Sequence, residues 1–498
     1  MQTIMNTYIK SLPVAALMLL AGCEKYLDKD PIGILTEEQV ETDPTVGTIT
    51  GAVTNAYVPL ASTLNLFGDW NWAQGLVLRN DFITEDIASG DANKKRSPDG
   101  DQAWMDDVAS FNFTPENGAF NGLWTYDYEG VSRTNLAISQ LTDDAIIQQT
   151  GMEQGLRNRL LGEAYFLRAF YYFNLVVNFG DVPLLLKPLT NFNEAYEVAR
   201  RVPKDEVWAQ ISSDLAEAAN LLPNAKYTVD GERWRASKGA AIALQAKTAL
   251  YRQQWQEVID NVQELETLGF YHLNSNYFDS FDVGKEFNEN EVIFAFDHQQ
   301  GVLPRRGNGL TALLGWGFLA PSPDFTGAFE PNDPRLDYTV NLPDQAVYKV
   351  LGATNTDNKG NDDAPSNKVY IRWADVLLWK AEAYNELGNY PQAIASINEV
   401  RQRARNTPLV GGGTAPAGTL PDRGDSTDKA QVKAWLMHER RVELGMESHR
   451  LSDLRRWGVA EAVLAAMGKN FQDRHYLYPI PQGEVDKSAG SITQNDGY

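Results

Sequence analysis

The chain has 498 residues with 66 acidic and 44 basic side chains, and its formal net charge at pH 7 is −22. A surface this negative repels polyanions, which argues against nucleic acids and heavily sulfated or uronic polysaccharides as ligands. A single cysteine excludes a disulfide within the chain, so burial must stabilise the fold, and 12 Trp, 21 Tyr and 20 Phe supply large apolar side chains for it.

The N-terminus has the pattern of an export signal with a lipid attachment site. Lys10 precedes an apolar stretch over 14–20, which ends in small residues and Cys23 and is too short to cross a bilayer. The ending Leu-Ala-Gly-Cys resembles the lipobox of bacterial lipoproteins. We therefore predict a signal peptide over 1–22, acylation of Cys23 and a short acidic tether over 23–35. The alternative is a secreted protein in which the cysteine is incidental.

Helical periodicity dominates the rest of the chain. The clearest helix has one face made by Leu160, Ala164, Leu167, Tyr171 and Leu175, and it should stop at Gly180. The same spacing predicts further helices over 44–61, 117–141, 204–222, 240–251, 255–268, 377–387 and 393–400.

The last two of these helices carry the signature of a tetratricopeptide repeat, in which small residues let two antiparallel helices approach closely. Its spacing is matched by Ala381, Tyr384, Gly388, Tyr390, Ala393 and Ile397. The pattern that begins at Trp255 is a degenerate version. We predict a mostly α fold in which about four such helical hairpins form a scaffold. An ordinary helical bundle would show the same periodicity and is the alternative.

Three long stretches lack helical periodicity, namely 62–115, 270–368 and 407–427. Segments of this length inside a compact domain are usually functional loops or disordered. The first two are rich in aromatic residues, which argues against disorder, whereas the third contains glycines at 411–413 and is predicted to be flexible. We predict a single domain over 36–498, in which these insertions carry the ligand face together with minor β-structure.

Several blocks of sequence, taken in order, resemble one known family. They lie at 23–28, 162–184, 372–383, 440–457 and 478–481, and they include Gly-Glu-Ala-Tyr-Phe-Leu-Arg-Ala near the start of the second block and Tyr-Pro-Ile-Pro as the last. Together they resemble the SusD/RagB family of outer-membrane lipoproteins, and the resemblance runs from Cys23 to the end of the chain. Met446 and Ser448 depart from the family pattern, which puts no functional position in doubt.

The resemblance implies a helical scaffold, irregular loops that bind a glycan, and a SusC-like TonB-dependent outer-membrane transporter as the partner. It also implies a lipid-anchored protein on the outer surface of the outer membrane, without enzymatic activity and without a cofactor. We favour a neutral oligo- or polysaccharide as the ligand, with a β-glucan such as laminarin as the specific guess. Two other classes stay open: a secreted glycoside hydrolase, and an assembly factor that binds protein or peptide.

The candidate glycan contacts are aromatic rings interleaved with polar side chains. A sugar stacks its C–H face on an indole ring, and its hydroxyls need fixed donors and acceptors. The predicted glycan-binding residues are Trp70, Trp72, Asn80, Asp86, Asn93, Lys94, Trp104 and Trp316. The alternative for each tryptophan is a place in the core. Shallow aromatic sites bind weakly, so we expect a Kd between about 1 μM and about 1 mM.

Glu439, Glu443 and Glu447 are the residues that the hydrolase alternative would use. They lie four residues apart on a predicted helix, a spacing that can bring two carboxylates together as in a retaining glycosidase. Arginines interleaved among them favour a structural ion-pair network instead. We predict no metal site, because the histidines are scattered and the calcium-like loop at 357–363 lacks its closing glutamate. We predict no nucleophilic catalysis either, because the sequence has no nucleophile elbow.

Overall fold

The structure is a computed structural model that describes residues 44–498 except 96, 98, 190–193, 195–197, 228–230 and 303–305. The predicted signal peptide, the lipid attachment site Cys23 and the tether lie outside the described residues. Within the described residues, no helix combines the length and the apolar character needed to cross a bilayer.

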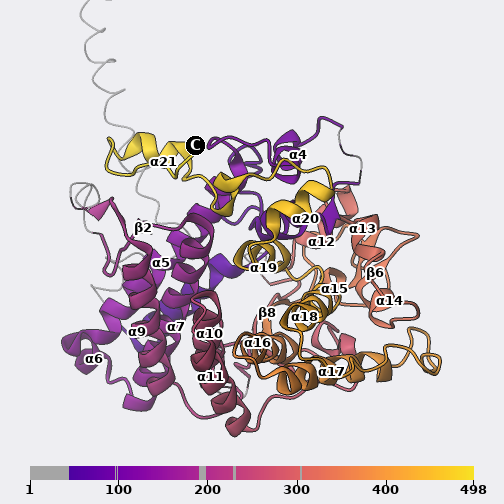
Figure 1. Cartoon of the computed structure of the whole chain (residues 1–498). Coiled ribbons are helices and arrows are strands. Elements are labelled where there is room, and N and C mark those ends of the chain that lie inside the picture. The colour runs from indigo at the N-terminus through magenta and orange to yellow at the C-terminus, as the bar shows by residue number, and fades with distance from the viewer. Residues whose placement is uncertain are drawn as a thin grey trace, which may run out of the picture.

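Four packed pairs of helices form the frame of the described structure. They are α3 (Val46–Tyr57) with α5 (Gly118–Thr142), α7 (Gln154–Phe179) with α9 (Lys204–Leu221), α10 (Lys238–Tyr251) with α11 (Trp255–Leu268), and α16 (Trp373–Glu386) with α17 (Tyr390–Asn406). Neighbouring pairs also contact each other, through α5 on α7, α9 on α10 and α11 on α16. In Figure 1 this array runs from the purple helices α5, α7 and α9 on the left to the orange helices α16 and α17 on the right. The predicted mostly helical fold with helical hairpins is confirmed.

Local sequence explains where these helices start, stop and touch. Helix α10 begins where the Ser237 hydroxyl accepts the Ala240 N–H, and its buried alanines let the neighbouring helices pack closely. Helix α7 ends at Gly180, whose positive φ of 73° favours glycine. The turn between α16 and α17 uses Gly388 at φ 79° in the same way.

The stretches predicted to be irregular contain short helices, which corrects that prediction. Residues 62–115 include the π-helix η3 (Phe82–Ile87) and α4 (Ala103–Ser110). Residues 270–368 include η4 (Tyr277–Ser280), α12 (Leu310–Trp316), α13 (Pro323–Thr326), α14 (Arg335–Thr339) and α15 (Tyr348–Leu351). These helices are too short to show a periodic pattern. In residues 407–427, by contrast, no helix or strand is present.

Four further helices of the described structure close the C-terminal part of the fold, namely α18 (Lys429–Glu443), α19 (Arg450–Arg456), α20 (Ala460–Ala466) and α21 (Gln482–Lys487), whereas α6 (Asp144–Thr150) packs on α5. Helix α18 packs on α16 and α17, and α19 packs on η3. In the view of Figure 1, α4, α12 and α20 lie above the array of helix pairs.

The described strands form four short antiparallel pairs, which confirms minor β-structure. They are β1 (Ala92–Asn93) with β5 (Ala320–Pro321), β2 (Val182–Pro183) with β3 (Arg201–Val202), β4 (Val292–Phe296) with β8 (Lys368–Arg372), and β6 (Val340–Asn341) with β7 (Ala346–Val347). The pair β1–β5 matters most for the site, because it joins the segment between η3 and α4 to the segment after α12. Buried side chains from α3 to Ile492 belong to one continuous core, which holds both inserted stretches on the helical frame.

Candidate functional site

Three of the predicted tryptophans come together on the surface. The ring centroids of Trp70 and Trp316 are 6.0 Å apart with 44° between their planes, and those of Trp72 and Trp316 are 6.4 Å apart at 57°. Trp70 is 51% exposed and Trp316 46% exposed, whereas Trp72 is half-buried against Phe318. Two indoles with half of their surface in water are unusual for a folded core. We call Trp70, Trp72 and Trp316 the tryptophan platform.

The glycines around Trp316 expose its ring. Trp316 is the last residue of α12, and Gly317 ends the helix at φ 92°. On the other side, a Cβ atom on Gly315 would lie 2.5 Å from the Cα of Gly360, so only glycine fits there. One glycine therefore serves the turn and the other a close backbone contact, and the indole between them keeps about half of its surface in water.

Trp70 occupies a backbone conformation that few side chains adopt. Its φ is 49°, in the left-handed region, and its N–H donates to Oδ1 of Asn65 over 2.9 Å. Such a conformation costs energy and persists only where surrounding contacts hold it. The surrounding loop therefore holds this indole in a fixed place at the surface.

Two exposed polar residues lie beside the platform. Asn93 pairs with Ala320 across β1 and β5, and the Lys95 N–H donates to the Gly317 carbonyl over 2.9 Å. Asn93 and Lys95 are both exposed, whereas Lys94 between them is buried. Both side chains are therefore in contact with water, Asn93 at the end of β1 and Lys95 in the turn that follows it. Asn93 is one of the predicted residues and Lys95 is not; no pattern in the polar sequence 93–95 distinguishes the exposed Lys95 from the buried Lys94.

Trp104 does not belong to the platform. It lies on α4, within the stretch 62–115 predicted to be irregular, and it is half-buried against the core. Its Nε1–H donates to Oε1 of Gln102 over 2.7 Å. Trp104 and Trp72 line the same small cavity of about 10 Å³ together with Leu313, so Trp104 supports the platform from below.

Asn80, Asp86 and Lys94 are buried, so we leave them out of the surface that a glycan would contact. Asn80 is 3% exposed and donates to two backbone carbonyls, and Asp86 is 4% exposed and accepts from the N–H and hydroxyl of Ser448. Lys94 is also 4% exposed, and its ammonium pairs with Asp106 over 2.8 Å and with Asp99 over 3.2 Å. Each polar group is occupied by the protein itself, which gives these residues a structural role.

Asp86 and its neighbour Glu85 are buried carboxyls whose charge the fold disfavours. Burial raises the pKa of Asp86 to about 8 and that of Glu85 to about 7, although hydrogen bonds from Ser448 and Ser452 act in the opposite direction. Helix η3 lies in the chain between the loop of Trp70 and the strand of Asn93. Asp86 joins it to Ser448, just before α19, and Glu85 joins it to Ser452 on α19.

These two carboxyls should make the fold less stable as the pH rises. The pKa of each carboxyl is higher in the folded than in the unfolded protein. Their contribution to the free energy of unfolding is therefore fully present below about pH 4, and it is lost as the pH rises through about 7 and 8. We expect the free energy of unfolding in urea to fall less between pH 6 and pH 8 in Glu85→Gln/Asp86→Asn than in the wild type. The exposed control Glu257→Gln should match the wild type, and an equal fall in all three proteins would contradict the assignment.

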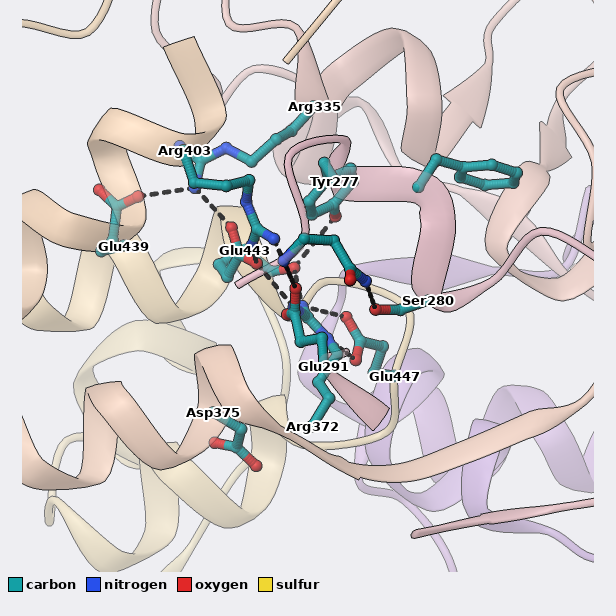
Figure 2. A network of polar contacts seen from close by, with 12 residues as sticks. Tyr277, Ser280, Glu291, Arg335, Arg372, Asp375, Arg403, Glu439, Glu443 and Glu447 are labelled. Carbon is teal, nitrogen blue, oxygen red and sulfur yellow. Dashed lines mark hydrogen bonds and ion pairs between the residues drawn. The ribbon is translucent and has the colours of Figure 1, made fainter. Parts of the chain in front are cut away.

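The three glutamates of the hydrolase alternative lie in a buried ion-pair network (Figure 2). The Glu443 carboxylate accepts from three guanidinium groups, those of Arg335, Arg372 and Arg403. Further pairs join Glu439 to Arg335 and Arg401, Glu447 to Arg372 and Lys349, and Glu291 to Arg372 and Arg403. The predicted structural ion-pair network is confirmed.

This network cannot perform glycoside hydrolysis. Glu439 and Glu443 have no exposed surface, so a glycan cannot reach them. A retaining glycosidase needs one carboxyl that stays protonated to serve as the acid. Here the neighbouring Arg and Lys cations lower the pKa of Glu447 to about 2 and hold that of Glu443 well below its usual range, so both stay ionised.

The calcium-like loop at 357–363 uses its polar groups internally. The Asp363 carboxylate accepts the N–H groups of Gly301 and Gly307, and the Asn361 side chain accepts the Asp363 N–H. Among the residues that the structure describes, His, Cys, Asp and Glu side chains form no group of three that could hold a metal ion.

Comparison with known families gives two matches that lie in different parts of the chain. Residues 344–498 match the model of the SusD family, and residues 68–250 match a model described as starch-binding, associating with outer membrane. The second match includes Trp70, Trp72 and all of α5, and the first includes the network glutamates on α18.

Individual proteins are similar over nearly the whole chain. The SusD-like protein P2 of Formosa agariphila is 26% identical, and the alignment covers 97% of this chain and 98% of that protein. Among solved structures, a laminarin-binding SusD-like protein is 24% identical with a TM-score of 0.71, covering 91% of this chain and 100% of that one. The surface glycan-binding protein A of Bacteroides thetaiotaomicron, solved with laminarihexaose, is 22% identical with a TM-score of 0.70, covering 91% and 99%.

Proposed function

The chain belongs to the SusD/RagB family, and we propose that it captures a neutral glycan on the tryptophan platform and delivers it to a SusC-like TonB-dependent outer-membrane transporter. It is a non-catalytic, surface glycan-binding member of that family. In this proposal an acyl chain on Cys23 attaches the protein to the outer membrane with the platform facing outward.

The observation that carries the proposal is the pair of exposed indoles, Trp70 and Trp316. A sugar ring buries its C–H face against an indole and gains hydrophobic stabilisation without a deep pocket. The backbone of Asn93 pairs with Ala320 and that of Lys95 bonds to Gly317, the neighbour of Trp316, so their exposed side chains are the candidate donors for hydroxyl groups. This is the composition of a shallow glycan site.

The tilt of the rings favours a curved glycan. Planes that meet at 44° and 57° cannot all stack on one flat ribbon of sugars, whereas a chain whose successive units turn can follow them. Laminarin forms such a curved chain, and cellulose is straight. Two solved relatives, one named as laminarin-binding and one solved with laminarihexaose, support the same choice, and the net charge of −22 supports a neutral ligand.

We expect laminarin to retard the protein in native affinity gels and hydroxyethylcellulose to retard it much less. The physical reason is that a straight chain can contact only one of the tilted indoles at a time. Equal or stronger retardation by the straight polymer would contradict the proposed ligand class. A protein that runs unretarded on every glycan of a broad panel would favour the assembly-factor alternative.

The shallow site also suits delivery. A Kd between about 1 μM and about 1 mM corresponds to only about −8 to −4 kcal/mol, so the bound glycan leaves quickly. Nanomolar binding of a short oligosaccharide with slow release would argue against delivery to a transporter.

A further inference from the structure

We propose that the first turns of α5 position the tryptophan platform by holding the loop of residues 65–77, which we call the tryptophan loop. The residues of α5 that do this are Gly118, Asn121 and Gly122, helped by Asn80 from the end of the loop. This role rests on the proposed function, because it concerns how the glycan surface is kept in shape.

Two glycines one turn apart on α5 allow direct contact between the helix and the loop backbone. A Cβ atom on Gly118 would lie 2.5 Å from the Ala73 carbonyl oxygen, and one on Gly122 would lie 2.3 Å from the Gly75 carbonyl oxygen. A Cβ on Gly75 would lie 2.0 Å from the Gly118 carbonyl oxygen, and Gly75 also has a φ of 66°. A side chain at any of these three positions would push the loop off the helix, because backbone atoms stand in the way at each. A Cβ on Gly122 would also lie 2.2 Å from the Asn80 amide nitrogen and would displace that side chain.

Three consecutive carbonyl groups of the loop accept hydrogen bonds from side chains. The Gln74 carbonyl accepts from Asn121 over 2.8 Å, and the Gly75 carbonyl accepts from Asn80 over 3.0 Å. The Leu76 carbonyl accepts from the Tyr126 hydroxyl over 3.5 Å. Asn121 and Tyr126 belong to α5, and Asn80 also donates to the Ala119 carbonyl of that helix over 3.3 Å. The helix therefore fixes the loop at three successive residues.

The contacts within the loop transmit this fixed position to the indoles. The Gly75 N–H donates to the Trp72 carbonyl over 2.9 Å, and the Leu76 N–H donates to the Asn71 carbonyl over 3.0 Å. At the base of the loop, the Asn65 N–H donates to the Val77 carbonyl over 2.7 Å, and the Asn65 side chain accepts from Trp70. A loop held in this way presents Trp70 and Trp72 to Trp316 before a ligand arrives, and this preorganisation lowers the cost of binding.

Gly122→Ala tests the positioning role, and Gly155→Ala is its matched control. Gly155 lies on α7, and a Cβ atom there would meet no other atom within 4 Å. Alanine is the better helix former at both positions, so intrinsic helix propensity does not distinguish the two variants. Asn121→Asp is a second test, because it keeps the shape of the side chain but cannot donate to the Gln74 carbonyl when ionised.

One readout does not depend on glycan. Two indoles close together give an exciton couplet in the far-ultraviolet circular dichroism spectrum, and the couplet of the platform is the part of the spectrum that disappears in Trp70→Phe. We expect Gly122→Ala and Asn121→Asp to weaken this couplet and to raise the Kd for laminarin about tenfold, while both still melt cooperatively. Gly122→Ala should melt below the wild type, because its new Cβ is overpacked against the loop. Gly155→Ala should change none of these.

An unchanged couplet in both test variants would overturn the positioning role, whatever the glycan result. A couplet that weakens while laminarin binding stays unchanged would support the positioning role and count against the platform as the glycan site. A couplet and an affinity that fall together, in a protein that still melts cooperatively, would support both.

Discussion

The double substitution Trp70→Ala/Trp316→Ala is expected to abolish measurable glycan binding. Aromatic residues at the centre of a binding surface typically contribute at least about 2 kcal/mol each, so removing both should cost about 4 kcal/mol and raise Kd about a thousandfold. A starting Kd of about 1 μM would rise to about 1 mM, the weak end of the expected range, and any weaker starting Kd would rise beyond that range, so retardation in an affinity gel should become very small or disappear. Each single substitution should weaken binding by a smaller factor.

The fold should survive this double substitution. Both indoles have about half of their surface in water, so their removal leaves no large cavity in the core. Leu387→Ala is the control, because Leu387 is 48% exposed but lies at the end of α16, away from the loops that carry the platform. It should bind glycan like the wild type. Normal retention by a folded Trp70→Ala/Trp316→Ala protein would place the site elsewhere.

The second large effect is expected in the buried network. Arg372→Met should lower the free energy of unfolding by about 3–5 kcal/mol, because the carboxylates of Glu291, Glu443 and Glu447 would each lose a cation while staying buried. Urea unfolding at pH 7 measures this loss. Lys487→Met breaks an ion pair in which the lysine is largely exposed, and it should change stability by about 0.5 kcal/mol or less.

The same network should protect the fold against acid down to low pH. The pKa of Glu447 is lowered to about 2, so its stabilising contribution is present above the unfolded pKa and is lost as the pH falls through about 2. Removing Arg372 should raise the pKa of Glu447, so that the stabilisation by Glu447 is lost at a higher pH. If Arg372→Met lowers the free energy of unfolding at pH 7 by less than about 1 kcal/mol, or unfolds in acid at the same pH as the wild type, the network contributes little to stability.

Much of the fold could be predicted because helix signals are local. The face of Leu160, Leu167 and Leu175 and the stop at Gly180 are encoded within one stretch, and the structure has α7 there. The short helices α4 and α12 could not be predicted, since each has too few turns for a repeating pattern and is held by tertiary contacts.

The site was less predictable because burial depends on contacts between distant segments. Asn80, Asp86 and Lys94 look like loop residues in the sequence. Asn80 is covered by α5, and Asp86 by Ser448, which is far away in the chain. Lys94 is neutralised by Asp106 on α4. The meeting of Trp70 with Trp316 likewise depends on how the two inserted stretches pack.

The most direct test of the central claim is protection of individual tryptophans from chemical oxidation, measured by peptide mass spectrometry with and without laminarin oligosaccharide. We predict that Trp70 and Trp316 are oxidised first in the free protein and become protected when the glycan binds. If the glycan binds while both indoles react as fast as before, and protection appears on another surface, the tryptophan platform is not the site.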